Sequence, residues 1–185
     1  MTGTNFDAQP ELASHVLLLR PLKREDFDGL FAAAGHPEVW AGHPAKDRYK
    51  RDVFEKYFDF LLGTGSTLVA IERTSNKIIG CSRYYTAPDQ PDSISIGFTF
   101  LNNAYWGGSF NFEMKRLMLD HAFKHYPEVW LHIAPDNIRS QKATAKLGAE
   151  HVYDTVLNLS GTPSPAMCFR LTKDAWKRAL AARMA

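Results

Sequence analysis

Apolar and polar positions alternate most regularly between residues 94 and 100. The apolar residues of this run are Ile94, Ile96, Phe98 and Phe100, and the small residues between them are Ser95, Gly97 and Thr99. A period of two is typical of a strand that buries one face. The run therefore predicts a strand whose second face carries only small side chains.

The period changes to that of a helix a few residues further on, in the stretch YWGGSFNFEMKRLMLDHAF at residues 105–123. Two apolar rows on one face predict a helix that packs on a sheet and leaves Lys115, Arg116, Asp120 and Lys124 in water. Gly107 and Gly108 come just before this helix. Because glycines let the backbone approach a ligand and helix-start amides face the same way, the turn suits a diphosphate.

The rest of the chain alternates short apolar runs with helical spacing. Further strands are predicted at residues 16–19, 67–72, 77–84, 129–133, 152–159 and 166–171, and further helices at 23–34, 51–62, 138–147 and 173–185. Residues 39–50 contain Gly42, Pro44 and many polar groups, which predicts an irregular connection. The order of these elements is typical of an α/β fold with a mixed sheet.

Composition and charge narrow the class of protein. The chain has 185 residues, of which 45% are hydrophobic and 23% charged, and this suits one domain over residues 1–185 with a loose lead-in at 1–14. A net charge of +2 without a basic block gives no reason to expect a nucleic-acid partner. No apolar run approaches the roughly 20 residues that span a bilayer, so no membrane partner is expected.

The two cysteines, Cys81 and Cys168, stand in apolar strand-like contexts without the spacing of a metal or redox motif. Buried free thiols in a reducing compartment are therefore expected rather than a disulfide. Nothing near Met1 reads as a signal peptide, since residues 2–9 are polar. Together these observations favour the cytoplasm.

Several motifs occur in a fixed order along the chain. They are Leu18-Leu19-Arg20-Pro21-Leu22, Ile78-Ile79-Gly80-Cys81-Ser82, Ile96-Gly97-Phe98-Thr99, Tyr105-Trp106-Gly107-Gly108 with Glu113, and Asn137-Ile138-Arg139-Ser140 with Lys146-Leu147-Gly148. With this set the chain resembles the GNAT superfamily of acyl-CoA-dependent N-acyltransferases, most closely the branch of ribosomal-protein N-terminal acetyltransferase-like enzymes. The resemblance covers nearly the whole chain.

The resemblance implies a fold, a cosubstrate and a reaction. The fold would be a single-domain mixed, mostly antiparallel sheet of about seven strands flanked by helices and splayed between the fourth and fifth strands, at 94–100 and 129–133. The pantetheine arm of acetyl-CoA would lie in that splay. The reaction would move the acetyl group to a primary amine, either a protein or peptide α-amine or a small amine, by direct attack in a ternary complex. A homodimer is left open.

The resemblance also assigns residues to acetyl-CoA. They are Thr99, Phe100, Leu101, Trp106, Gly107, Gly108, Ser109, Phe110, Asn111, Asn137, Lys142 and Lys146. The fixed positions of the family's pyrophosphate loop fall here on Trp106, Ser109 and Asn111, so the chain departs from the usual small residues. Asn111 either contacts the cofactor or caps the helix. Lys142 and Lys146 either meet phosphates or belong to a solvated helix face.

Catalytic candidates follow from the same resemblance. The Tyr that protonates the leaving thiolate in many relatives is replaced here by Thr144, and Ser140 stands where the ribosomal-protein-like branch places a serine for this role. Asn137 is expected to orient pantetheine or a water, or simply to cap the helix. His132 is the titrating group best suited to act as a base, although a lone His on a strand is commonly structural.

Two alternatives remain at this stage. His121 and His125 lie four residues apart on a helix, but no third ligand is evident, so no metal is expected. The missing Tyr and the altered loop would also suit a non-catalytic CoA-binding or regulatory module on the same fold.

Overall fold

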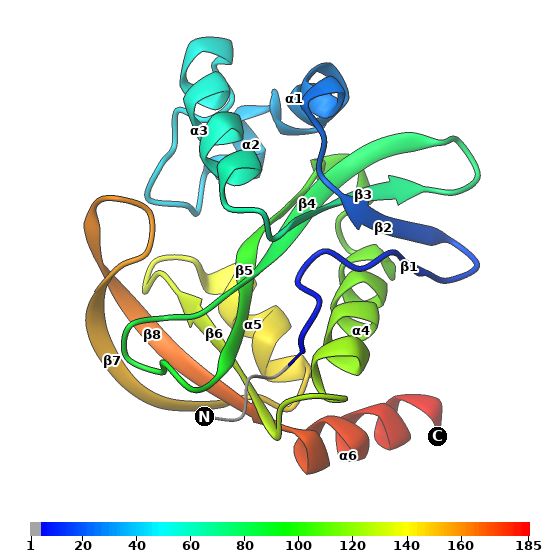
Figure 1. The fold of residues 1–185 in the computed structure, drawn as a ribbon, viewed down its shortest axis with the longest axis vertical. Coiled ribbons are helices and arrows are strands. Elements are labelled where there is room, and N and C mark those ends of the chain that lie inside the picture. The colour runs from blue at the N-terminus through cyan, green and yellow to red at the C-terminus, as the bar shows by residue number, and fades with distance from the viewer. Residues whose placement is uncertain (1–4) are drawn as a thin grey trace. The chain divides into compact units, whose positions relative to one another are not determined.

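The structure is a computed structural model that describes residues 5–185. The described chain forms two compact units, one of residues 5–84 and 98–121 and the other of residues 85–97 and 122–185. Strand β5 (Ile94–Leu101) begins in the second unit and ends in the first. Figure 1 shows the ribbon of the chain.

The first unit holds the elements from the N-terminal half and one long helix. They are β1 (Leu12–Ala13), β2 (Leu17–Pro21), η1 (Arg24–Asp26), α1 (Phe27–Ala34), α2 (Pro37–Trp40), α3 (Arg51–Gly63), β3 (Thr67–Glu72), β4 (Lys77–Tyr85), η2 (Asn103–Tyr105) and α4 (Phe110–Ala122), of which β4 and α4 end one residue inside the second unit. Strands β1 to β4 pair with their sequence neighbours in antiparallel fashion.

The second unit holds β6 (Glu128–Ile133), α5 (Ile138–Lys146), β7 (Glu150–Asn158), β8 (Pro163–Thr172) and α6 (Lys173–Met184). Strand β8 pairs antiparallel with both β6 and β7, and the β7–β8 hairpin is the long orange pair of Figure 1. The eight strands therefore form the mixed, mostly antiparallel sheet of an α/β fold, as the sequence predicts. The two-residue β1 is an addition to the seven predicted strands.

The pairing of β5 with β6 is parallel and short. Its register joins Ile94 to Val129 and Ser95 to Trp130, and the pairing within the second unit ends after these two residue pairs. Phe98 then has a φ of +52°, a left-handed conformation that bulky residues rarely adopt, so the extended course of β5 is interrupted. This short register agrees with the splay expected between these two strands.

An aromatic core fills the first unit. Its buried residues come from α1, α2 and α3 and from one face of the strands, and they include Trp40, Phe54, Phe58 and Phe100. Gly80 in β4 has a physical reason, because a Cβ there would lie 2.0 Å from the Phe100 carbonyl oxygen. Only glycine allows β4 and β5 to approach this closely.

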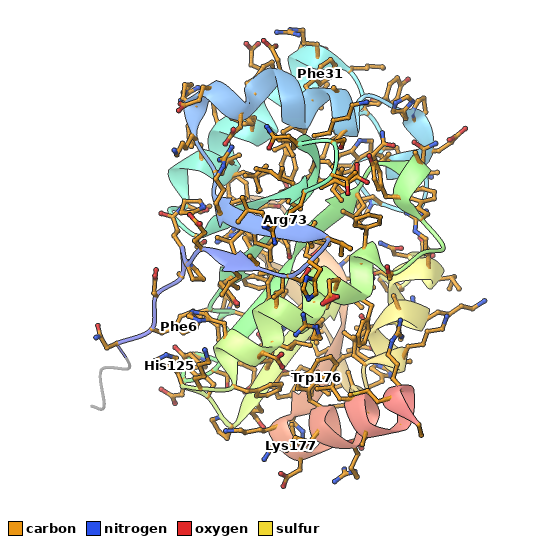
Figure 2. All side chains as sticks on the ribbon, turned by 90° about the vertical axis from the view of Figure 1, so that its right-hand side faces the viewer. Phe6, Phe31, Arg73, His125, Trp176 and Lys177 are labelled. Atoms are coloured by element: carbon orange, nitrogen blue, oxygen red, sulfur yellow. The ribbon has the colours of Figure 1, made fainter. Side chains whose placement is uncertain are left out.

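The lead-in predicted at residues 1–14 falls partly outside the described residues. In the described part, the Phe6 ring lies 5.0 Å from the rings of both Tyr84 and His121, and Figure 2 shows Phe6 on the N-terminal segment. The carbonyl oxygen of Asp7 lies 2.8 Å from Nε2 of His121. Residues 5–13 are therefore held by packing, by this contact and by the β1–β2 pairing.

The last helix, α6, is capped at its start and buries Trp176. Thr172 caps α6 by accepting a hydrogen bond from the Ala175 amide at 3.2 Å. Trp176 is 2% exposed, whereas its neighbour Lys177 is exposed to solvent (Figure 2).

Within residues 5–185 no helix combines the length and the apolarity needed to cross a bilayer.

Candidate active site

The glycine turn leaves room on its outer side. Gly107 has a φ of +74°, a backbone conformation that favours glycine, and Gly107 and Gly108 are both exposed. A Cβ built on either glycine would meet no heavy atom within 4 Å. The turn is anchored behind by Trp106, whose indole Nε1 donates to the Leu101 carbonyl at 3.0 Å. A ligand could therefore approach the turn without a side chain in the way.

Helix α4 begins directly after this turn. The Glu113 amide donates to the Ser109 carbonyl at 2.8 Å, so the amides of Phe110 and Asn111 come before the first hydrogen bond of the helix. Asn111 lies inside the first helical turn rather than at the cap, which removes the capping interpretation of this residue. The Phe110 ring packs edge-on against Tyr105 at 5.1 Å. This helix start suits an anion.

The predicted pantetheine positions follow in β5. Phe100 and Leu101 are buried, whereas Thr99 is half-buried. The Thr99 hydroxyl lies 2.7 Å from the Ser82 hydroxyl and accepts a hydrogen bond from Lys115 Nζ at 2.7 Å. The side chain of Thr99 is therefore engaged within the first unit.

Lys115 corrects one expectation from the sequence. The helical pattern predicts Lys115 in water, yet the residue is 7% exposed. Burial lowers the pKa of its ammonium to about 7. The helical pattern could not predict this burial, because the Lys115 ammonium donates to the Thr99 hydroxyl on β5, which lies 16 residues away in the sequence.

The catalytic candidates from the sequence lie at the start of α5 in the second unit. Asn137 caps the helix, and its Oδ1 accepts a hydrogen bond from the Ser140 amide at 3.2 Å. The Ser140 hydroxyl makes no hydrogen bond to any residue that the structure describes, and Ser140 is half-buried. Helix capping therefore accounts for the side chain of Asn137, whereas the hydroxyl of Ser140 takes no part in the cap.

Other α5 positions divide between solvent and core. Lys142 and Lys146 are exposed, which leaves both the phosphate contact and the solvated face open. Thr144, which stands at the place of the missing Tyr, is buried, with 4% of its surface exposed. The cofactor residues predicted at 99–111 belong to the first unit, whereas Asn137, Ser140, Lys142 and Lys146 belong to the second.

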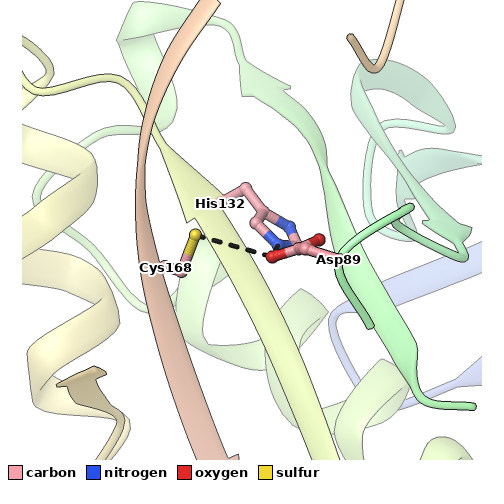
Figure 3. Close-up of side chains that lie close together, drawn as sticks. All are labelled: Asp89, His132 and Cys168. Carbon is pink, nitrogen blue, oxygen red and sulfur yellow. Dashed lines mark hydrogen bonds and ion pairs between the residues drawn. The ribbon is translucent and has the colours of Figure 1, made fainter. Parts of the chain in front are cut away.

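A hydrogen-bonded group around His132 was only partly visible in the sequence. The Tyr85 hydroxyl lies 2.8 Å from His132 Nδ1, and His132 Nε2 lies 3.4 Å from Asp89 Oδ2 without forming a hydrogen bond. Figure 3 shows Asp89 facing both His132 and Cys168. The Tyr153 hydroxyl donates to the same oxygen of Asp89. No periodicity or motif connects these residues, since they come from a strand end, a loop and three other strands.

Burial sets the charge of this group. The His132 side chain is 1% exposed, and burial lowers the pKa of its imidazole, although the Asp89 carboxylate acts in the opposite direction. His132 is thus held neutral near pH 7 with a carboxylate beside it. Gly97 packs against the same group, because a Cβ there would lie 2.9 Å from the Tyr85 ring, and this explains the glycine as a packing residue.

Two sets of residues could be considered for a metal. The ligand atoms of Asp89, His132 and Cys168 all lie within 4.8 Å of one another, which the sequence did not indicate. Asp89 Oδ2, however, is engaged by the Tyr153 hydroxyl and lies 3.8 Å from the Cys168 thiol. His121 of the predicted His pair is engaged by the Asp7 carbonyl. The absence of a metal stays a prediction.

Comparisons with known proteins place this geometry in a family. The family model described as an acetyltransferase (GNAT) domain matches residues 16–150. No curated protein matches the sequence.

Solved structures share the fold at low sequence identity. A GCN5-related N-acetyltransferase from Brucella melitensis has a TM-score of 0.81 at 17% identity, over 95% of this chain and 84% of its own. An acetyltransferase of the GNAT family from Bacillus anthracis has a TM-score of 0.71 at 13% identity, over 89% and 99%. Mycobacterium smegmatis RimJ, solved in complex with CoA-disulfide, has a TM-score of 0.65 at 17% identity, over 94% and 93%. Because the family model spans most of the chain, the protein belongs to the GNAT acetyltransferase family.

Proposed function

We propose that the protein transfers the acetyl group of acetyl-CoA to a primary amine by direct attack in a ternary complex. The observation that carries the proposal is the open glycine turn at the start of α4, inside the segment matched by the acetyltransferase family. The acceptor is a protein or peptide α-amine or a small amine.

The residues of the turn fit the cosubstrate. Gly107 and Gly108 present backbone without side-chain obstruction, and the amides of Phe110 and Asn111 precede the first helical hydrogen bond. These groups would hold the diphosphate of acetyl-CoA. Acetyl-CoA supplies the activated thioester, and the arm that carries it would run along Thr99, Phe100 and Leu101.

The leaving sulfur needs a proton, and Ser140 is the donor we assign. Its hydroxyl is not consumed by capping, because Asn137 binds the Ser140 amide instead. Asn137 fixes the first turn of α5 and thereby the position of that hydroxyl. The thiol that forms has a pKa near ~8.5, so the sulfur departs readily as thiolate, and Ser140 would recover from water the proton that it donates.

The attacking amine must lose a proton, and we assign this step to Tyr85 and His132. Both nitrogens of His132 are covered, one by the Tyr85 hydroxyl and the other by burial beside Asp89, so an acceptor cannot reach the imidazole directly. Tyr85 would take the proton from the amine and pass its own to Nδ1. Asp89 would then offset the charge of the imidazolium.

The state of the two cysteines supports a cytoplasmic location, which we also propose. Cys81 and Cys168 are both buried and free, as expected from the sequence. Buried free thiols are typical of a reducing compartment.

Two measurements test the proposed function. Calorimetry with acetyl-CoA reports binding, and release of CoA thiol in the presence of a panel of amines reports turnover. We expect both binding and amine-dependent thiol release. Binding without turnover on any amine would favour the non-catalytic module instead. Absence of acetyl-CoA binding would contradict both.

A further inference from the structure

The guanidinium of Arg48 occupies an unusual position for a cation. It comes from the segment between α2 and α3 and lies 3.6 Å above the Tyr57 ring and 5.5 Å from the Trp40 ring. Within residues 5–185 no carboxylate forms an ion pair with it, and burial lowers its pKa. A half-buried cation without a counter-ion is unfavourable. The site therefore offers a charge that the described chain does not neutralise.

His43 presents a second hydrogen-bond donor beside the Arg48 guanidinium. The Ala45 amide donates to His43 Nδ1 at 3.0 Å, so a neutral His43 carries its proton on Nε2. Burial, together with Arg48, lowers the pKa of His43 to about 4, and the ring is neutral near pH 7. Nε2 then faces Arg48 Nη1 at 3.4 Å, which brings two donors together with no acceptor between them. One oxyanion could accept from both.

A second guanidinium lies along the same row of aromatic rings. Arg83 lies 4.8 Å from the Phe98 ring and 5.5 Å from the Phe60 ring, and its Nε donates to the Ser66 hydroxyl at 3.3 Å. Phe60 in turn stacks on Tyr57 at 6.3 Å. Both guanidiniums act electrostatically on the Tyr57 hydroxyl and the Cys81 thiol. The first unit therefore places two cations on one aromatic surface.

We infer that Arg48 and His43 bind a carboxylate of the amine acceptor. A guanidinium and an N–H donor at this spacing match two oxygens of a planar carboxylate. The inference rests on the proposed function and names its substrate class: a small primary amine that also carries a carboxylate.

The charge must come from the acceptor rather than from the cosubstrate. The diphosphate is assigned to the Gly107–Gly108 turn, the 3′-phosphate of the cosubstrate lies on the ribose beyond that diphosphate, and the acetyl group and pantetheine arm carry no charge. Phe98, under Arg83, directly precedes the positions assigned to that arm in β5. A carboxylate at the Arg48 subsite is therefore the anchor that holds the acceptor while its amine points elsewhere.

Matched pairs of acceptors test this inference. We would measure kcat/KM for glycine against glycinamide, β-alanine against β-alaninamide, and 4-aminobutyrate against its amide. With each kcat/KM expressed per free amine, the wild type should favour the carboxylate member of at least one pair by about ten- to one-hundred-fold, the range of a charge-assisted hydrogen bond. Arg48→Gln should lower that ratio by the same factor, and Arg48→Lys should lower it less. The ratio does not depend on the folded fraction of a variant.

Arg24→Gln is the matched control, because Arg24 is an exposed arginine that pairs with Asp59 at 2.7 Å. It removes the same charge and should leave the ratio unchanged. A wild type without preference for any carboxylate, or an Arg48→Gln variant that loses both members of a pair equally, would overturn the inference.

A second readout works without turnover. Glutarate, a dicarboxylate that lacks an amine, should raise the unfolding midpoint of the wild type by at least about 2 °C at saturation, whereas glutaramide should not. Arg48→Gln should abolish the glutarate effect. No shift with glutarate would contradict the subsite. Absence of thiol release with every amine, together with a glutarate shift, would contradict the proposed function and leave the subsite standing.

Discussion

The Tyr85 hydroxyl lies 2.8 Å from His132 Nδ1, and this contact joins the end of β4 to the middle of β6 within one unit. The His132 side chain is 1% exposed, so in the proposed mechanism Tyr85 would connect it to the acceptor. The sequence suggested His132 as a base but could not show that a phenol covers it.

The pH dependence of the rate should reveal this pair. His132 must be neutral to accept a proton, and burial lowers its pKa below 6.5, so kcat/KM should fall on the acid side with a midpoint below that value. Asp89 raises the pKa of His132, and Asp89→Asn should therefore move the acid limb to still lower pH. Cys168 and Tyr153, which also border Asp89, should titrate only above this range because burial raises their pKa values to about 11 and about 12.

Substitutions give the matching test. Tyr85→Phe and His132→Gln should each lower kcat by about 10²–10⁴-fold, the usual contribution of general acid–base catalysis. His151→Gln is the control, because His151 forms a comparable pair with Asp154 at 2.7 Å in an exposed position. Equal rates for Tyr85→Phe and the wild type would remove the pair from the mechanism.

Ser140→Ala should lower kcat while the dissociation constant of acetyl-CoA stays within about twofold, because the hydroxyl acts only on the departing sulfur. Steady-state kinetics and calorimetry on the same preparation would check this. A change in affinity without a change in rate would assign Ser140 to cofactor binding instead.

Asn137→Ala separates capping from catalysis. Loss of the cap at α5 should cost about 1 kcal/mol of stability, and Thr172→Ala should cost a similar amount at α6. Only the Asn137 variant should also reduce kcat, since α5 carries Ser140. Urea unfolding of both variants provides the stability scale. If both variants keep the wild-type rate, Asn137 is a structural cap.

Gly108→Val should weaken acetyl-CoA binding by about tenfold or more, which is roughly 1.4 kcal/mol, without changing the unfolding midpoint. The Cβ of residue 108 has open space in the protein itself, so a loss of affinity would come from the ligand. Gly107→Val differs because its φ of +74° disfavours valine and should also lower stability. Unchanged affinity in Gly108→Val would place the diphosphate elsewhere.

Lys115 makes a separate prediction about stability. The pKa of this lysine is lowered from 10.5 to about 7, so between these values the unfolded chain binds more protons than the folded protein. Stability should then rise as the pH increases from about 7 toward 10.5. Lys115→Met should remove this rise and stabilise the protein at pH 6 by about 1–3 kcal/mol.

In Lys115→Met the Thr99 hydroxyl keeps the Ser82 hydroxyl as a hydrogen-bond partner. Lys124→Met, at an exposed position two residues after the end of α4, should change stability by less than about 0.5 kcal/mol at every pH. Urea unfolding at several pH values would decide, and an unchanged slope in Lys115→Met would contradict the assignment.

Local pattern determined much of this protein. The alternation at residues 94–100 predicted β5, the apolar rows predicted α4, and Asn137 was recognisable as a possible cap. These features depend on neighbours a few residues away, and that is the range over which periodicity and capping chemistry act. The ordered motifs added the family, which the domain match then showed.

Side-chain contacts that no local period describes were decided only by the tertiary structure. The burial of Lys115, the cover that Tyr85 places on His132 and the paired donors of Arg48 and His43 all involve side chains that no helical or strand period brings together. The enclosure that lowers the pKa values of Lys115, His132 and His43 is a property of packing rather than of residue type. The sequence therefore indicated the reaction, and the fold supplied the proton path and the charge of the acceptor that we propose.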